Sequence, residues 1–163
     1  MAYDRVAAVE YARQWAFSRN PRFYDFEELG GDCTNFVSQC VYAGAGVMNY
    51  TPEFGWYYVS LNMRTPSWTG VQFFYNFMTT NSGDGPYGYE APISEAQIGD
   101  VIQFAFNDSP NFTHTLLVVR TGRNPNPRNI LLSTHSYDAF NRPMDSYTYT
   151  NARLIHIDGV RGQ

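Results

Sequence analysis

The chain has 163 residues, of which 44% are hydrophobic and 17% aromatic, and its formal net charge is −4. This length accommodates one substantial hydrophobic core, so we expect a single domain over residues 1–163. All 11 basic residues are arginine and form no basic run, which argues against nucleic acid as a partner.

No window approaches the roughly 18 apolar residues needed to span a bilayer, so we expect no membrane insertion. The N-terminal segment lacks the basic start and apolar stretch of a secretory signal. Localisation stays open, because a domain cut from a longer secreted or cell-envelope protein carries no signal of its own. We expect a monomer without a cofactor.

Two helices are predicted in the first 45 residues. Residues 4–19 repeat apolar side chains at helical spacing behind Asp4, which is a suitable N-cap. The next helix starts within GGDCTNFVSQC, residues 30–40, with Asp32 as its cap, and ends near Gly44. Its apolar face consists of Phe36, Val37, Cys40 and Val41.

Residues 44–68 are rich in glycine, proline and aromatic residues without a sustained period, which predicts a long loop. A third helix is predicted over residues 69–80, with a break at NSGDGPYG, residues 81–88. Four short β-rich segments follow, at residues 100–106, 114–121, 129–135 and 152–157. Their short connections favour an antiparallel sheet, and helices followed by strands indicate an α+β fold.

Cys33 is the main candidate for chemistry, because the dipole at a helix start lowers the pKa of a thiol. The alternative is that Cys33 packs as a small buried hydrophobe, the role expected for Cys40 on the apolar face. If Cys33 and Cys40 lie on one helix, their α-carbons are about 10 Å apart along its axis. This distance is too long for a disulfide, so we expect none. Gly30 and Gly31 favour the role of nucleophile for Cys33. They allow the backbone just before Cys33 to approach another group closely, and a cysteine that only packs in the core does not require this.

A cysteine nucleophile needs a base, usually histidine, and a third group that orients the base. His114 and His135 each border a predicted strand, and their rings come close if these strands are neighbours. We therefore predict Cys33 as nucleophile, His114 as base and His135 as orienting residue, with Asp138 as the rival third member. A histidine beside a strand is more often structural, and we assign that role to His156.

Other chemistries find less support. No residue pair has the short spacing of a zinc site, so no metal is expected, although a dispersed Cys-His-His site is conceivable. Sugar hydrolysis by paired carboxylates is the other enzymatic alternative. The candidates near predicted turns are Asp32, Asp84, Asp100 and Asp138. Aspartates there are mostly turn formers, and we assign Asp100 to the start of a strand.

Four segments together resemble the bacterial putative amidase domain family, a branch of the papain-like NlpC and CHAP cysteine peptidases that cut cell-wall peptides. They are GGDCTNFVSQC, GDVIQF, HTLLVV and THSYD followed by RP. The resemblance covers the chain from about Tyr3 to Asp158. It implies a papain-like α+β fold, in which N-terminal helices pack on a C-terminal antiparallel sheet.

The resemblance also implies Cys33 as nucleophile, His114 as base and His135 as third member of a cysteine-dependent amide or peptide hydrolase. The implied substrate is a peptide or the peptidoglycan of a bacterial cell wall, cleaved through an acyl-enzyme. The alternatives are a catalytically silent cell-wall-binding module of the same fold and an acyltransferase using the same site.

Flat aromatic rings suit sugar and peptide surfaces, so a group of them is predicted to line the substrate groove with Asp32. These aromatic residues are Tyr24, Trp56, Tyr57, Tyr58 and Trp68. Packing in the core is an equal alternative for each ring.

Overall fold

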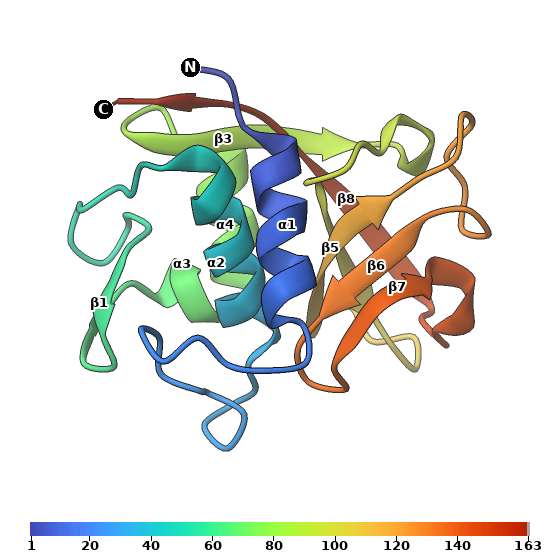
Figure 1. Cartoon of the computed structure of the whole chain (residues 1–163), viewed down its shortest axis with the longest axis horizontal. Coiled ribbons are helices and arrows are strands. Elements are labelled where there is room, and N and C mark those ends of the chain that lie inside the picture. The colour runs from blue at the N-terminus through green and yellow to red at the C-terminus, as the bar shows by residue number, and fades with distance from the viewer. Residues whose placement is uncertain (163) are drawn as a thin grey trace.

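The computed structural model describes residues 1–162, with helices concentrated in the first half and a sheet in the second (Figure 1). The helices are α1 (Arg5–Trp15), α2 (Cys33–Ala45), α3 (Pro66–Thr69) and α4 (Val71–Thr80), with 3₁₀ turns η1 (Ile93–Glu95) and η2 (Met144–Ser146). The strands are β1 (Tyr58–Ser60), β2 (Met63–Arg64), β3 (Gly85–Ala91), β4 (Val101–Ala105), β5 (His114–Arg120), β6 (Leu131–Thr134), β7 (Ala139–Pro143) and β8 (Asn151–Arg161). The predicted α+β class is confirmed.

The main sheet has six strands in the order β3-β8-β4-β5-β6-β7, and each neighbouring pair is antiparallel. The predicted antiparallel neighbours β4, β5 and β6 therefore lie side by side. Strand β8 returns between β3 and β4, so the last strand of the chain lies inside the sheet (Figure 1). Strands β1 and β2 form a separate two-stranded sheet.

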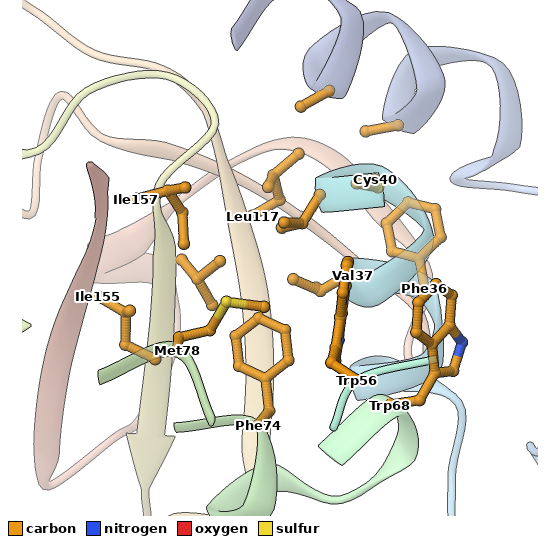
Figure 2. Packing of buried hydrophobic residues seen from close by; sticks show 14 of the residues in the cluster. Phe36, Val37, Cys40, Trp56, Trp68, Phe74, Met78, Leu117, Ile155 and Ile157 are labelled. Atoms are coloured by element: carbon orange, nitrogen blue, oxygen red, sulfur yellow. The ribbon is translucent and has the colours of Figure 1, made fainter. Parts of the chain in front are cut away.

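The helices cover one face of this sheet and share a core with it. Figure 2 shows Phe36, Val37 and Cys40 of α2 packed in the same cluster as side chains from the strands, Leu117 and Ile155 among them. The predicted apolar face of α2 is confirmed, because its four members are fully buried.

The opposite face of the sheet has its own smaller core. Alternation along β5 sends Leu117 to the helices and Leu116 and Val118 to the second core, where Leu132 and Met144 join them. Side chains at alternate positions of a strand therefore enter opposite layers, and the same alternation determines which face of the sheet each strand histidine occupies.

The helix ends match the predictions only in part: α1 ends at Trp15, short of the predicted residue 19, and α4 begins at Val71, two residues after its predicted start. The Asp4 side chain accepts a hydrogen bond from the Ala7 N–H at 3.0 Å, as expected of an N-cap. Helix α2 ends before Gly46, which takes the left-handed conformation at φ 70°. Asp32 stands at the N-cap position of α2, but its side chain makes no capping hydrogen bond. The predicted capping role of Asp32 is wrong, because its carboxylate faces other partners.

Both edge strands of the main sheet were missed from the sequence. The predicted break at residues 81–88 runs into β3, and β7 lies between the last two predicted strands, where no element was expected. Edge strands often carry glycine, proline and polar residues, because one side makes no ladder, so their pattern resembles a turn. The predicted loop over residues 44–68 likewise contains β1, β2 and most of α3.

The state of the cysteines agrees with the expectation of no disulfide. Cys33 and Cys40 are both free thiols. Within residues 1–162, no helix combines the length and the apolar character that crossing a bilayer requires.

Replacing Leu117 by alanine should lower the free energy of unfolding by about 2–5 kcal/mol, because the side chain is fully buried between helices and sheet. Urea denaturation measures this change. Leu29→Ala is the matched control, since Leu29 is 55% exposed and should change stability by less than about 0.5 kcal/mol. Equal losses in the two variants would contradict the described core.

Candidate active site

A cavity of about 490 Å³ lies where the start of α2 meets the start of β5. Four segments that are distant in the sequence form its walls. They contribute Gly30, Gly31 and Cys33; Phe106, Thr113 and His114; Ser136 and Tyr137; and Arg142, Ser146, Tyr147 and Thr148. The predicted nucleophile and base are thus brought to one cavity.

The loop before α2 approaches the cavity through two glycines in the left-handed region. Gly30 has φ 90° and Gly31 has φ 98°, values that residues with a β-carbon rarely adopt. A β-carbon on Gly31 would lie 3.5 Å from the Ser136 hydroxyl oxygen. The tight backbone approach expected upstream of Cys33 is not found, because a β-carbon would meet nothing at Gly30 and only an ordinary contact at Gly31; the left-handed backbone is what favours glycine at these two positions.

Cys33 is the first residue of α2 and is 8% exposed. Burial raises the pKa of the Cys33 thiol, although hydrogen bonds from Thr115 and Thr34 oppose this effect, and the negative charge of Asp32 raises the pKa further. The predicted lowering of the Cys33 pKa is wrong, because burial outweighs the helix start. The thiol keeps its proton at neutral pH until a base removes it.

Polar contacts fix the start of α2 on β5. The hydroxyls of Thr34 and Thr115 lie 2.9 Å apart within hydrogen-bonding distance, and both residues are buried. The side-chain amide of Gln103, from β4, donates to the Thr115 hydroxyl at 3.3 Å. These bonds hold Cys33 at a defined place beside the first residues of β5.

His114 is the first residue of β5 and is partly buried. Burial lowers the pKa of His114 to about 4, and the positive charge of Arg142 contributes to this lowering. The imidazole is therefore uncharged at neutral pH and can accept a proton. Within residues 1–162 no hydrogen bond holds its ring, whose centroid lies 6.3 Å from that of Tyr147.

His135 does not contact His114. Its Nδ1 lies 2.5 Å from the Asp32 carboxylate and its Nε2 lies 2.8 Å from the carbonyl oxygen of Trp15. The ring also stacks on Phe36 with centroids 4.0 Å apart.

The register of the sheet explains this arrangement. Leu117 pairs with Ser133, and continuing this register places Thr115, not His114, opposite His135. Thr115 and His135 therefore face the helices, whereas His114 has the parity of the other face. The rival third member, Asp138, binds Arg19 at 2.9 Å. Neither candidate for the third member orients the His114 ring in this structure.

Asp32 is buried and is not among the cavity-lining residues, so the prediction that it binds substrate is wrong. One carboxylate oxygen accepts hydrogen bonds from the Phe26 N–H at 2.8 Å and the Asn35 side-chain amide at 2.9 Å. The other oxygen faces His135. Asp32 therefore fixes the chain at the entry to α2.

Two predicted groove tryptophans belong to the core. Trp56 and Trp68 have no exposed surface, and their rings lie 4.6 Å apart. Their indole N–H groups donate to the Ser38 hydroxyl at 3.2 Å and the Asn35 side-chain oxygen at 3.0 Å. The prediction that they contact substrate is wrong, because both indole rings pack inside the core (Figure 2).

The three predicted groove tyrosines also lie away from the cavity. Tyr58 is buried, and its hydroxyl accepts a hydrogen bond from the Tyr24 N–H at 2.8 Å. Tyr24 and Tyr57 are more exposed, but neither is among the cavity-lining residues of the described chain.

Sequence reasoning missed the aromatic and basic residues that do line the cavity, namely Phe106, Tyr137, Tyr147 and Arg142. A signal existed in the segment THSYD followed by RP, which contains Tyr137 and Arg142. The left-handed backbone of Ser136 (φ 58°) and Tyr137 (φ 69°), which turns this segment towards the cavity, follows from no residue pattern.

A charged network joins the turn after β6 to the loop before α2. Arg19 contacts Asp138 at 2.9 Å and Glu27 at 3.4 Å. Glu27 accepts hydrogen bonds from the hydroxyl of Ser136 at 2.8 Å and from its N–H at 3.2 Å. The Ser136 hydroxyl in turn accepts the Asp32 N–H at 3.2 Å. Both loops therefore form one connected cavity wall.

Asp100 and His156 form a separate structural cluster. Asp100 is fully buried and binds Arg5 at 2.8 Å and His156 Nδ1 at 3.0 Å. The assignment of His156 to a structural role is confirmed. Asp100 directly precedes β4, and it also pairs with Arg5 and His156 in a buried cluster. In the part of the chain described, no three His, Cys, Asp or Glu residues are grouped to hold a metal ion.

Comparison with known proteins supports the resemblance to the putative amidase domain family. The family model described as "Putative amidase domain" matches residues 2–157. The Bacillus subtilis (strain 168) protein named "Uncharacterized protein YhbB" is 33% identical over 154 residues, which are 91% of this chain and 47% of that protein. "Uncharacterized protein YjcM" of the same strain is 24% identical over 98% of this chain and 37% of its own length.

The chain therefore spans less than half the length of these curated relatives. No solved structure matches it at a significant level.

Replacing Asp32 by asparagine should lower the free energy of unfolding by about 3–5 kcal/mol, because it leaves His135 without its charged partner in a buried site. Chemical denaturation at pH 7 measures the change. Glu10→Gln is the control, since the Arg13–Glu10 pair is more than half exposed and should contribute less than about 1 kcal/mol. An Asp32→Asn protein as stable as the control would contradict the role of this pair.

Proposed function

The chain belongs to the putative amidase domain family, and we propose that it is a cysteine-dependent amide hydrolase with Cys33 as nucleophile and His114 as general base. The observation that carries the proposal is that these two residues, distant in the sequence, line the same cavity. A thiol and an uncharged imidazole facing a common space are the minimum set for acyl transfer through a cysteine.

The proposed reaction starts from a protonated thiol and an uncharged imidazole. His114 takes the proton of Cys33 as the sulfur attacks the carbonyl carbon of the amide, which forms a C–S bond and a tetrahedral intermediate. The imidazolium returns the proton to the leaving nitrogen as the C–N bond breaks, which leaves a thioester on Cys33. Water, deprotonated by His114, then hydrolyses the thioester to a carboxylic acid and restores the thiol.

The N-terminus of α2 supports stabilisation of the intermediate. The backbone N–H groups in the first turn of a helix have no partner within the helix, and that of Cys33 stands beside the attacking sulfur. Such an N–H is suited to receive the negative oxygen of the intermediate. Losing one donor of this kind costs about 2.7–4 kcal/mol of transition-state stabilisation.

Catalysis requires one rearrangement relative to this structure. Within residues 1–162, no hydrogen bond joins Cys33 and His114, and no acceptor orients the imidazole. Hydrogen bonds of catalytic groups commonly tighten only when substrate binds. We therefore propose that substrate in the cavity brings the His114 ring and the thiol into contact.

We propose peptides of the bacterial cell wall as the substrate class and a papain-like arrangement as the fold. Support comes from the match to the family model, from relatives in Bacillus subtilis, and from a nucleophile at the start of a helix that packs on an antiparallel sheet. The cavity volume falls within the range of small-molecule sites, which suits a short peptide segment.

A cell-wall-binding module without turnover is the second candidate. The observations that favour it are the raised pKa of the Cys33 thiol and the absence, in the described residues, of a group that orients His114. Such a module would retain the cavity and lack the reaction, so an activity measurement separates the two functions.

Incubation with purified peptidoglycan should release new free amino groups, identified by mass spectrometry of the products. Cys33→Ala should lower this rate by a factor of about 10³ or more, because no other group can form the thioester. Cys40→Ala is the matched control and should retain cleavage, since Cys40 lies in the core. Undiminished cleavage by Cys33→Ala would refute the proposed nucleophile, and new reducing sugar ends would indicate the carboxylate alternative.

The pH dependence should report the lowered pKa of His114. The base acts only when uncharged, so kcat/KM should stay level at neutral pH and fall as the pH drops through about 4. Arg142→Gln removes a positive charge that disfavours imidazolium, so it should raise the pKa of His114 and move this acidic limb to higher pH. Arg142→Lys retains the charge and should leave the limb near its original position.

Circular dichroism at each pH verifies that the protein remains folded over the range of the profile. A wild-type limb near the ordinary histidine pKa of about 6.5, or one unmoved by Arg142→Gln, would argue against His114 as the base.

A further inference from the structure

Arg142 is the permanently charged side chain in the wall of the cavity. No other lining residue in the described chain is an aspartate, glutamate, lysine or arginine. The protein as a whole has a net charge of −4, whereas the charged side chain in the cavity lining is positive. A positively charged cavity in an acidic protein favours an anionic ligand.

The Arg142 guanidinium is held in place by its own segment. It lies over the Tyr147 ring, with 3.8 Å between the guanidinium carbon and the ring centroid. Its Nε donates to the Ser146 hydroxyl at 2.9 Å, and one Nη donates to the Ser146 carbonyl oxygen at 3.2 Å. The orientation of the guanidinium plane is therefore set before any ligand arrives.

These contacts leave part of the guanidinium unused. A guanidinium has five N–H donors, and the bonds to Ser146 occupy two of them. Within residues 1–162 no carboxylate lies within 4.0 Å of an Arg142 nitrogen. The two Nη groups can bind a carboxylate in the bidentate geometry that arginine favours.

We infer that Arg142 binds a free carboxylate of the substrate, so that the bond attacked at Cys33 belongs to a peptide with a carboxylate close to that bond. The inference about substrate rests on the proposed function, whereas the binding of a carboxylate beside Cys33 does not require turnover. Both residues line one cavity of about 490 Å³, so the carboxylate and the attacked carbonyl belong to the same residue or to close neighbours.

Alkylation of Cys33 tests this inference without relying on hydrolysis. N-Bromoacetyl-alanine and N-bromoacetyl-alaninamide carry the same thiol-reactive group and differ in whether the far end is a carboxylate or a neutral amide. Rates at Cys33 are measured by peptide mapping at pH 8.5, with N-acetylcysteine as the reference thiol. The readout is the ratio of the two rates, in which any change in the intrinsic reactivity of Cys33 cancels.

In the wild type the ratio should favour the carboxylate reagent by about tenfold or more over the ratio for N-acetylcysteine, because a hydrogen-bonded charge pair aligns this reagent. Arg142→Gln should return the ratio to the reference value, and Arg142→Lys should retain part of the preference. A wild-type ratio equal to the reference, or a preference that persists in Arg142→Gln, would overturn the inference.

Ligand binding to the Cys33→Ala protein is a second measurement that does not depend on thiol reactivity. N-Acetylalanine should raise its Tm while N-acetylalaninamide should not, and Arg142→Gln in the same background should abolish the difference. Equal shifts from the two compounds would overturn the inference. Failure of the proposed function would appear instead as uncleaved peptidoglycan, with the carboxylate preference intact.

Discussion

The site depends on the hydrogen bonds that the buried carboxylate of Asp32 makes with its neighbours. A carboxylate removed from water is tolerated only when charged or polar partners surround it, and here they come from three segments. Phe26 supplies a backbone N–H, Asn35 a side-chain amide, and His135 a ring nitrogen from the end of β6. Asp32 thereby ties the start of α2 to the end of a strand, which places Cys33 and the turn after β6 on one cavity.

Burial sets the chemistry of the cavity as well as its shape. It raises the pKa of the Cys33 thiol and lowers that of the His114 imidazole, so each group is uncharged at neutral pH. The proposed reaction therefore couples proton transfer to the attack on the amide, instead of starting from a preformed thiolate and imidazolium. Arg142 adds to the effect of burial in lowering the pKa of His114 and supplies the positive charge in the wall, so one residue affects both the base and the inferred ligand.

The sequence predicts elements whose side chains are buried on one face or both. Apolar periodicity identifies α1, α2 and α4 and the strands β4, β5, β6 and β8. It misses the edge strands β3 and β7, where unpaired ladders permit proline, glycine and polar residues. Composition shows that residues 44–68 are rich in aromatic side chains. It does not predict whether Trp56 and Trp68 face a groove or the core, because that depends on tertiary packing.

The candidate site follows the same division between local and long-range information. The helix start at Cys33 and the strand start at His114 are local signals, and the structure places both on one cavity. The place of His135 depends on strand register, and a shift of one residue sends its ring to the opposite face of the sheet. The contribution of Arg142 depends on a left-handed turn at Ser136 and Tyr137 that local patterns do not encode.

The covalent intermediate offers the most direct measurement of the central claim, that Cys33 is the nucleophile. Protein quenched in acid during turnover of peptidoglycan-derived peptides can be digested and mapped by mass spectrometry. The account predicts an acyl group on the peptide that contains Cys33, removed by hydroxylamine as a thioester would be. An acyl group attached to any other residue would contradict it.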